Sequence, residues 1–238
     1  MSTLILQSPG VILNPPPGSI DPPDLGISGL VTRHVPAADY MAGENVTVVG
    51  DLISGRAMTV SGGTAQMAVV GGLLAARIAG GAKLETNSYA YANGRNRSLA
   101  LMMHIGSIPT ATRQPAGTLY SGTGGLHASF SLVAVSSVNG YPAAYGDASP
   151  YPRLTSVMAP GWHRVIATFN QDGTGAVAVD GVVARGAQGF TGSASTIAAS
   201  VRSFADMIVS FADMAVFDHA LSDAEIAAVD AGMASWLA

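Results

Sequence analysis

Acidic side chains at alternating strand positions would be the most direct source of chemistry in this sequence. Hydrolysis of a glycosidic bond uses two carboxylates, and in a strand only residues i, i+2 and i+4 point into one cleft. The chain has three glutamates, and neither Glu44 nor Glu85 has a second carboxylate two residues away. Glu225 lies three residues after Ser222, where it is explained as part of a helix cap. We therefore expect no catalytic pair and predict that the protein is not an enzyme.

The histidines show no spacing typical of a metal site or of a nucleophile's partner. They are His34, His104, His127, His163 and His219. The sequence has no H-E-x-x-H helix motif, no G-x-S-x-G turn around a nucleophilic serine and no cysteine. We expect His163, which follows Trp162 at the start of an apolar run, to have a structural role, and His104 to be a half-buried strand residue.

Four aspartates fall in predicted loops and are the candidates for calcium binding. They are Asp51, Asp147, Asp172 and Asp206. None belongs to the dense run of oxygen ligands that a calcium loop requires, so a turn-stabilising role is the preferred interpretation. We predict no cofactor and assign no metal, with calcium left as a possibility that no motif supports.

Three tyrosines form the most suggestive surface feature, in the stretch VNGYPAAYGDASPYPR over residues 138–153. Tyr141, Tyr145 and Tyr151 could present rigid apolar rings with hydroxyl groups to a sugar or to a protein neighbour. The alternative is a long hairpin loop whose Tyr-Pro pairs pack on the loop itself. Both tryptophans, Trp162 and Trp236, are better explained as core residues than as ligand contacts.

The proline-rich stretch over residues 7–28 predicts an extended N-terminal arm, because proline-dense segments favour polyproline II and cannot join a central sheet. Its candidate partner-docking residues are Pro15, Pro16, Pro17, Pro22 and Pro23. Two interpretations stay open: the arm lies against its own domain, or it docks on another subunit. We divide the chain accordingly into an arm over residues 1–28 and one domain over residues 29–238.

After residue 29, short apolar runs alternate with turn signals such as SGGT, AGG, YANGRN, SGTGG, VNGYP and NQDGTG. Runs of five to eight residues separated by such turns predict an all-β sandwich or jelly roll. The clearest hairpin joins residues 165–169 to 176–181 through NQDGTG, and Asp180-Gly181 makes a second tight turn. The run MAVVGGLLAARIAGG is expected to be extended. Ser222 and Glu225 predict one helix, whose buried face holds Ile226, Val229, Met233 and Trp236.

Four segments resemble laminin-G-like, concanavalin-A-type jelly-roll domains. They are Gly161–Gly186, with a Trp-His strand opening and a "VDG" turn, Ala212–Val229, Val48–Val60 and Ala76–Thr86. The resemblance covers residues 29–238 and implies a two-sheet antiparallel jelly roll with a short C-terminal helix.

A repeated heptad, SFADMIV-SFADMAV, occupies residues 203–216 and is compatible with a helix or a strand. The family resemblance places a strand over Phe211–Asp218 and a loop around Phe204–Met207. With period two, Phe211, Asp213, Ala215 and Phe217 would share one face of the strand, and Ala212, Met214 and Val216 the other. A helix over this segment is the alternative.

Composition limits the function classes. Only 11% of residues are charged, the net charge is −4 and Lys83 is the only lysine, so nothing predicts nucleic-acid binding. We expect no signal peptide and no membrane insertion. A surface so poor in charge favours one partly covered by neighbours, and hence a homo-oligomer.

Two function hypotheses follow. The first is a structural or decoration protein of a virus particle, on the capsid or tail of a tailed bacteriophage. Its arm would dock on other virion proteins, and its jelly roll, displayed outward, could hold host glycans weakly. The second is a bacterial carbohydrate-binding or adhesion module, extracellular or at the cell surface.

Overall fold

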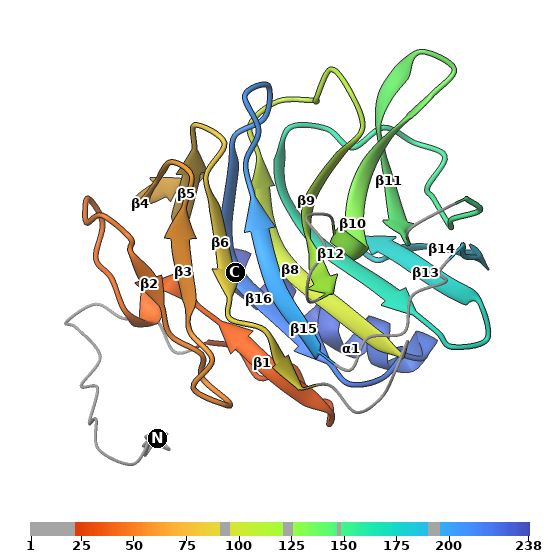
Figure 1. The fold of residues 1–238 in the computed structure, drawn as a ribbon, viewed down its shortest axis with the longest axis horizontal. Coiled ribbons are helices and arrows are strands. Elements are labelled where there is room, and N and C mark those ends of the chain that lie inside the picture. The colour runs from red at the N-terminus through yellow and green to blue at the C-terminus, as the bar shows by residue number, and fades with distance from the viewer. Residues whose placement is uncertain (1–21, 91–95, 121–125, 147–148, 190–195) are drawn as a thin grey trace.

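Strands with alternating side chains dominate the computed structural model, which describes residues 22–90, 96–120, 126–146, 149–189 and 196–238 (Figure 1). The strands are β1 (Leu30–His34), β2 (Val48–Val49), β3 (Met58–Ser61), β4 (Thr64–Val70), β5 (Leu73–Ala79), β6 (Lys83–Thr86), β7 (Tyr89–Ala90), β8 (Arg97–Ile105), β9 (Arg113–Tyr120), β10 (Leu126–Val135), β11 (Val138–Tyr145), β12 (Gly161–Phe169), β13 (Thr174–Val179), β14 (Val182–Ala187), β15 (Thr196–Arg202) and β16 (Val209–Phe217). The helices are α1 (Asp223–Ala234) and the 3₁₀ turns η1 (Pro36–Ala38) and η2 (Ser235–Leu237).

Within the described residues the strands form two antiparallel sheets of eight strands each. One sheet has the order β14-β13-β12-β8-β16-β5-β4, with β1 paired to β16; the other has the order β11-β10-β9-β15-β6-β3-β2, with β7 paired to β15. The predicted all-β, two-sheet antiparallel sandwich is confirmed. The MAVVGGLLAARIAGG run is extended as predicted, because it forms the β4–β5 hairpin around Gly71-Gly72.

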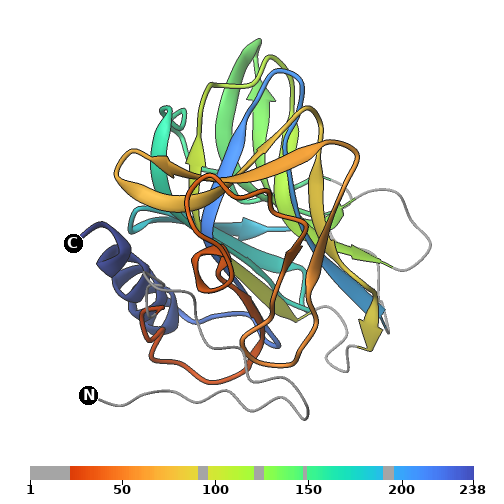
Figure 2. The ribbon, with the colours of Figure 1, turned by 90° about the vertical axis from the view of Figure 1, so that its left-hand side faces the viewer.

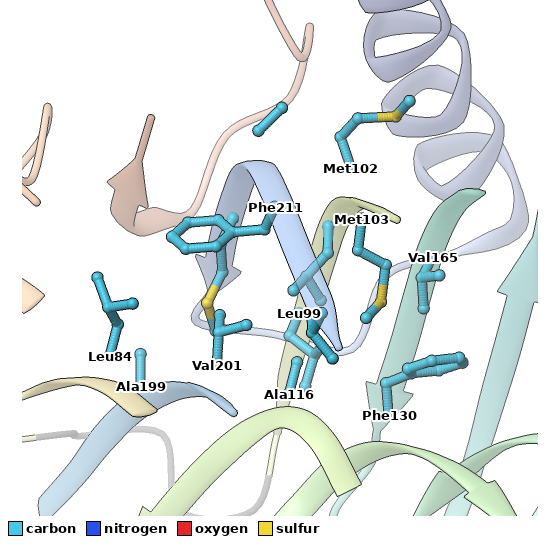
Figure 3. Close-up of a cluster of buried hydrophobic side chains, with 14 of the residues drawn as sticks. Leu84, Leu99, Met102, Met103, Ala116, Phe130, Val165, Ala199, Val201 and Phe211 are labelled. Atoms are coloured by element: carbon cyan, nitrogen blue, oxygen red, sulfur yellow. The ribbon is translucent and has the colours of Figure 1, made fainter. Parts of the chain in front are cut away.

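The core lies between the two sheets (Figure 3). Leu84, Phe130 and Val201 from one sheet face Phe211 and Met103 from the other, and all five are 0% exposed. Each side chain of this size contributes about 1.5–3 kcal/mol when it leaves water, so this layer supplies the main driving force for folding.

Helix α1 covers the outer face of the sheet that contains β8, β12 and β16 (Figure 2). Ser222 caps it with the predicted capping box, in which the Ser222 hydroxyl accepts from the Glu225 N–H. Ile226, Val229 and Met233 pack on the sheet as expected. No helix within the described residues has the length and apolar character needed to cross a membrane.

The second copy of the heptad is the strand β16, which confirms that prediction, while the first copy makes a short turn closed by hydrogen bonds between Phe204 and Met207. The predicted division of faces in β16 is wrong. A bulge between Phe211 and Asp213 inserts one residue, so Phe211 shares the inter-sheet core with Met214 and Val216. Ala215 and Phe217 instead face helix α1.

The predicted VNGYP turn is also corrected. The chain reverses at Ser136-Ser137, where both residues have positive φ (48° and 70°), and VNGYP begins strand β11. Pro142 is tolerated there because its carbonyl accepts from the Leu154 N–H, so the side of its backbone that lacks an N–H is directed away from β10. Tyr141 and Tyr145 are therefore strand residues rather than loop residues.

The described part of the proline-rich segment lies against its own domain. Leu25 is buried with helix α1, and Gly232 approaches it so closely that a Cβ there would be 2.7 Å from the Asp24 carbonyl oxygen. Pro22 and Pro23 are half-buried. Pro15, Pro16 and Pro17 lie outside the described residues, so their docking role stays a prediction.

Candidate functional site

A two-stranded ribbon at one sheet edge brings the three predicted tyrosines together. Residues 152–154 run along β11 and pair with it: the Ala144 N–H donates to the Pro152 carbonyl (3.0 Å), and the Leu154 N–H donates to the Pro142 carbonyl (2.9 Å). Ala143 stands opposite Arg153 in this ladder. Because side chains alternate along extended chains, the odd-numbered residues of both segments share one face.

On that face four side chains surround Ala143, which is fully buried beneath them. We call Tyr141, Tyr145, Tyr151 and Arg153 the tyrosine–arginine cluster. The Tyr145 and Tyr151 rings lie 5.1 Å apart between centroids with their planes tilted by 48°. The Arg153 guanidinium lies 5.6 Å from the centroid of the Tyr141 ring. With Ala143 opposite Arg153, the register puts Tyr145 opposite Tyr151 and Tyr141 diagonal to Arg153, and the two distances fit these positions.

The surroundings hold the cluster in place. Gln188, which follows β14, donates from Nε2 to the Ala144 carbonyl (3.0 Å), and the Gly189 N–H donates to the Pro150 carbonyl (2.5 Å). These bonds link the residues that follow β14 to β11 and to Pro150, at the end of the sandwich where β11 and β14 are the last strands of their sheets (Figure 1). The three rings stay half-buried and Arg153 is exposed, so the cluster has a rigid base and an accessible top.

Sequence reasoning named the tyrosines but missed Arg153. Arg153 and Tyr151 are two residues apart, as are Tyr141, Ala143 and Tyr145, so each set lies on one face of an extended chain. The sequence does not show that the two sets share a face, because that depends on residues 152–154 pairing with β11.

The histidine with the most enzyme-like partners is His163, yet both of its ring nitrogens are engaged. Nδ1 lies 2.7 Å from Asp180 Oδ2, and Nε2 lies 2.8 Å from the Ala159 carbonyl oxygen. Burial lowers the pKa of His163, but the bonds to Asp180 and Ala159 outweigh it and raise the pKa above its usual value. No ring nitrogen is left to take a proton from a substrate, which fits the predicted structural role.

The remaining histidines whose side chains are described do not converge on a site. His34 is fully buried on β1, and His104 is half-buried on β8 with its ring edge-on to Trp162 at 5.4 Å. Trp162 is itself half-buried and donates to the Val70 carbonyl (2.7 Å). His219 lies between Asp218 and Glu225 at the start of α1. The side chain of His127 lies outside the described residues.

The loop aspartates stabilise turns in the described part of the chain. Asp51 accepts from the backbone N–H groups of Arg33, Ile53, Ser54 and Arg56. Asp206 accepts from Thr110 and Arg113, and these bonds hold its pKa well below the usual range. Asp172 accepts from Thr174; Asp147 is not described. Among the described residues no group of three or more acidic or histidine side chains is placed to hold a metal ion.

No protein-family model and no curated protein sequence matches this chain. Solved structures do resemble it in fold. The sialidase of Trypanosoma rangeli superposes with a TM-score of 0.59 at 18% identity, over 87% of this chain and 33% of the sialidase. The binding domain of botulinum neurotoxin serotype D/C gives 0.60 at 10% identity, over 86% of this chain and 52% of that domain.

A botulinum neurotoxin type C structure, described for the toxin's interaction with two ganglioside molecules, gives a TM-score of 0.59 at 11% identity. The chain therefore spans about a third of the sialidase and about half of the toxin domains. At these identities the comparisons show a shared two-sheet β-sandwich fold.

Proposed function

We propose that this chain is a non-catalytic glycan-binding module that works at a cell or particle surface. The observation that carries the proposal is the tyrosine–arginine cluster, in which two rings 5.1 Å apart lie half-exposed on a braced sheet edge. Tyrosine rings bind the apolar face of a sugar and offer hydroxyl groups for its polar edge. The sialidase and ganglioside-related neighbours support this, since they place the same fold in proteins that handle glycans.

The absence of a catalytic role is part of the proposal. His163 has no free ring nitrogen, and the two carboxylates nearest in sequence, Asp223 and Glu225, lie in the first turn of α1, where they serve Arg185 and the capping box. The sialidase is an enzyme, but the shared fold covers only a third of it.

Binding to an immobilised glycan library tests the proposal, with Tyr151→Ala and Tyr151→Phe as matched variants. We expect the wild type to bind a defined set of glycans, Tyr151→Ala to lose at least tenfold in affinity, and Tyr151→Phe to keep most of it because the ring remains. A wild type that binds no glycan, or equal binding by Tyr151→Ala with an unchanged melting temperature, would contradict the proposal.

Strand β14 favours a second candidate function, assembly into a larger particle such as a phage virion. It is the edge of its sheet, and its pairing with β13 is regular from Val182 to Ala187. Val182 and Val183 are 62% and 40% exposed. In an antiparallel pair only every second residue bonds to the neighbouring strand. The register with β13 leaves the backbone N–H and C=O of Val183 and Arg185 directed away from β13, and they have no partner within the described residues. Such an edge can accept an added strand.

In this version the N-terminal arm of a neighbouring copy would occupy the β14 edge. Residues 4–6 (LIL) and 11–13 (VIL) are apolar, and the first charged side chain is that of Asp21. Size-exclusion chromatography with light scattering tests it on the full chain, on a variant lacking residues 2–20, and on Val183→Pro. Oligomers that both changes dissociate would support it; oligomers that survive both, or a monomeric wild type, would exclude it.

A further inference from the structure

The tyrosine–arginine cluster contains a cation whose charge is not neutralised by the described residues around it. Most cations of the described chain are held by carboxylates, such as Arg33 by Asp213, Arg113 by Asp206 and Arg185 by Asp223. Arg153 has no acidic partner among the residues that the structure describes. Its contact is the Tyr141 ring.

The ring of Tyr141 offers Arg153 only its face, 5.6 Å from the guanidinium carbon, and no described residue accepts a hydrogen bond from the guanidinium. The N–H groups in the guanidinium plane can therefore take a bidentate partner. Arg153 is exposed and stands opposite Ala143, held there by the hydrogen bonds that its neighbours Pro152 and Leu154 make to β11. Its stem therefore starts from a fixed point beside the rings, and the head group is positioned without being neutralised.

The cation and the ring pair are spaced for a single small ligand. Arg153 and Tyr151 are two residues apart on one extended segment, which places their side chains about 6.6 Å apart on the same face. This is about the width of one sugar ring with a substituent. A ring packed on Tyr151 would therefore hold a substituent on its edge within reach of the guanidinium.

We infer that the cluster selects sugars that carry a carboxylate. The carboxylate would pair with the in-plane N–H groups of Arg153, while the apolar face of the sugar packs on Tyr151 beside Tyr145. The inference rests on the proposed glycan-binding function and adds the ligand class. It is not a consequence of overall charge, because the net charge of the chain is −4 and would repel acidic ligands.

The test is a glycan array with matched pairs, glucuronate against glucose and sialyllactose against lactose as terminal groups, probed with the wild type, Arg153→Gln and Arg153→Lys. We expect the wild type to prefer the acidic member of a pair by about tenfold, the factor that corresponds to about 1.4 kcal/mol. Arg153→Gln should abolish the preference and keep the affinity for neutral members. Arg153→Lys should keep part of it, because it retains the charge but loses the planar fork.

Arg77→Gln is the matched control, since Arg77 is an exposed arginine on β5, outside the cluster, and has no ion pair within the described chain. It should leave the preference unchanged. Glycan binding without preference for carboxylates, a preference for sulfated sugars alone, or a preference that survives Arg153→Gln would overturn the inference and leave the proposed function standing. If no glycan of either kind binds, both fail.

Discussion

His34 is a buried base that the fold keeps neutral. It is fully buried on β1, Nδ1 lies 3.1 Å from the Gly50 carbonyl oxygen, and Nε2 has no hydrogen-bond partner among the described residues. Burial lowers its pKa, against weaker opposing effects from Asp51 and from the backbone. A proton therefore binds the unfolded chain more readily than the folded one.

We predict that His34 makes the protein less stable in acid. Since its folded pKa lies below the unfolded value of 6.5, its contribution is fully present above pH 6.5 and is lost as pH falls toward the folded pKa. Urea unfolding at pH 7.5, 6.0 and 5.0 measures this in the wild type and in His34→Gln. The difference between the two should shrink with falling pH, by at most about 1.4 kcal/mol per pH unit.

His163 and His219 act in the opposite direction, which is why the comparison uses a variant. Burial opposes their charged forms, but carboxylate partners raise both pKa values above 6.5. Their contributions are present below pH 6.5 and are lost as pH rises through the folded pKa. A pH-independent difference between wild type and His34→Gln would show that His34 is not the acid-sensitive group.

The ion pair between Arg33 and Asp213 is buried, and we predict that removing the charge of one partner strongly lowers the free energy of unfolding. Arg33 Nη2 lies 2.6 Å from Asp213 Oδ2, and Trp236 Nε1 donates to the same oxygen at 3.1 Å. Asp213→Asn would leave a buried guanidinium uncompensated and should cost about 3–5 kcal/mol in unfolding free energy. Denaturant titration measures it.

Asp223→Asn is the matched control for that experiment. Asp223 also pairs with an arginine, Arg185, but its side chain is 79% exposed, so its loss should cost about 0–1 kcal/mol. Equal effects of the two changes would contradict the argument that burial sets the value of the pair.

At the scale of elements, the contact between the N-terminal lead-in and helix α1 gives a prediction about backbone fit. Gly232→Ala improves intrinsic helix propensity by about 1 kcal/mol. The new Cβ would lie 2.7 Å from the Asp24 carbonyl oxygen and 3.3 Å from the Leu25 Cα, so the lead-in must move. We expect faster proteolytic cleavage around residues 22–28 and no gain in melting temperature. A stabilised, protease-resistant variant would show that the lead-in does not depend on this contact.

The elements that could be predicted from sequence are those specified locally. The capping box at Ser222 and Glu225 and the Asp180-Gly181 turn each contain their own hydrogen-bonding or conformational signal, and both appear in the structure. Short apolar runs bounded by turn residues were enough to place β8, β10 and β12. A jelly roll followed from these strands and from the family resemblance.

The predictions that were wrong or incomplete concern features set by partners distant in sequence. The bulge in β16 arises where β16 pairs with β8, about a hundred residues away, so Phe211 could not be assigned to its face. The turn at Ser136-Ser137 needs two serines at positive φ, which composition does not favour. Arg153 joined the site only because residues 152–154 pair with β11.

At the scale of the whole molecule, the protein has few charged side chains to repel other copies of itself. Only 11% of residues are charged, and several of those charges are internally paired, as in Arg164 with Asp230 and Arg202 with Glu85. The remaining surface consists largely of small and uncharged residues. Repulsion between copies therefore depends on the net charge of −4 more than on local charge patterns.

We predict that the protein self-associates reversibly as pH approaches 5.6, the isoelectric point of the sequence, because the net charge then vanishes while the exposed β14 edge persists. Light scattering between pH 8 and pH 5 measures the mass of the full chain. Val183→Lys adds a charge at the β14 edge. The control Val69→Lys adds the same charge at an exposed valine on β4, whose edge is already covered by hydrogen bonds to Gly43, Glu44 and Val46. We expect Val183→Lys to reduce association more than Val69→Lys does. Equal effects of the two lysines would mean that net charge alone controls association and that β14 is no special contact, while a mass independent of pH would show that the uncharged surface itself resists contact.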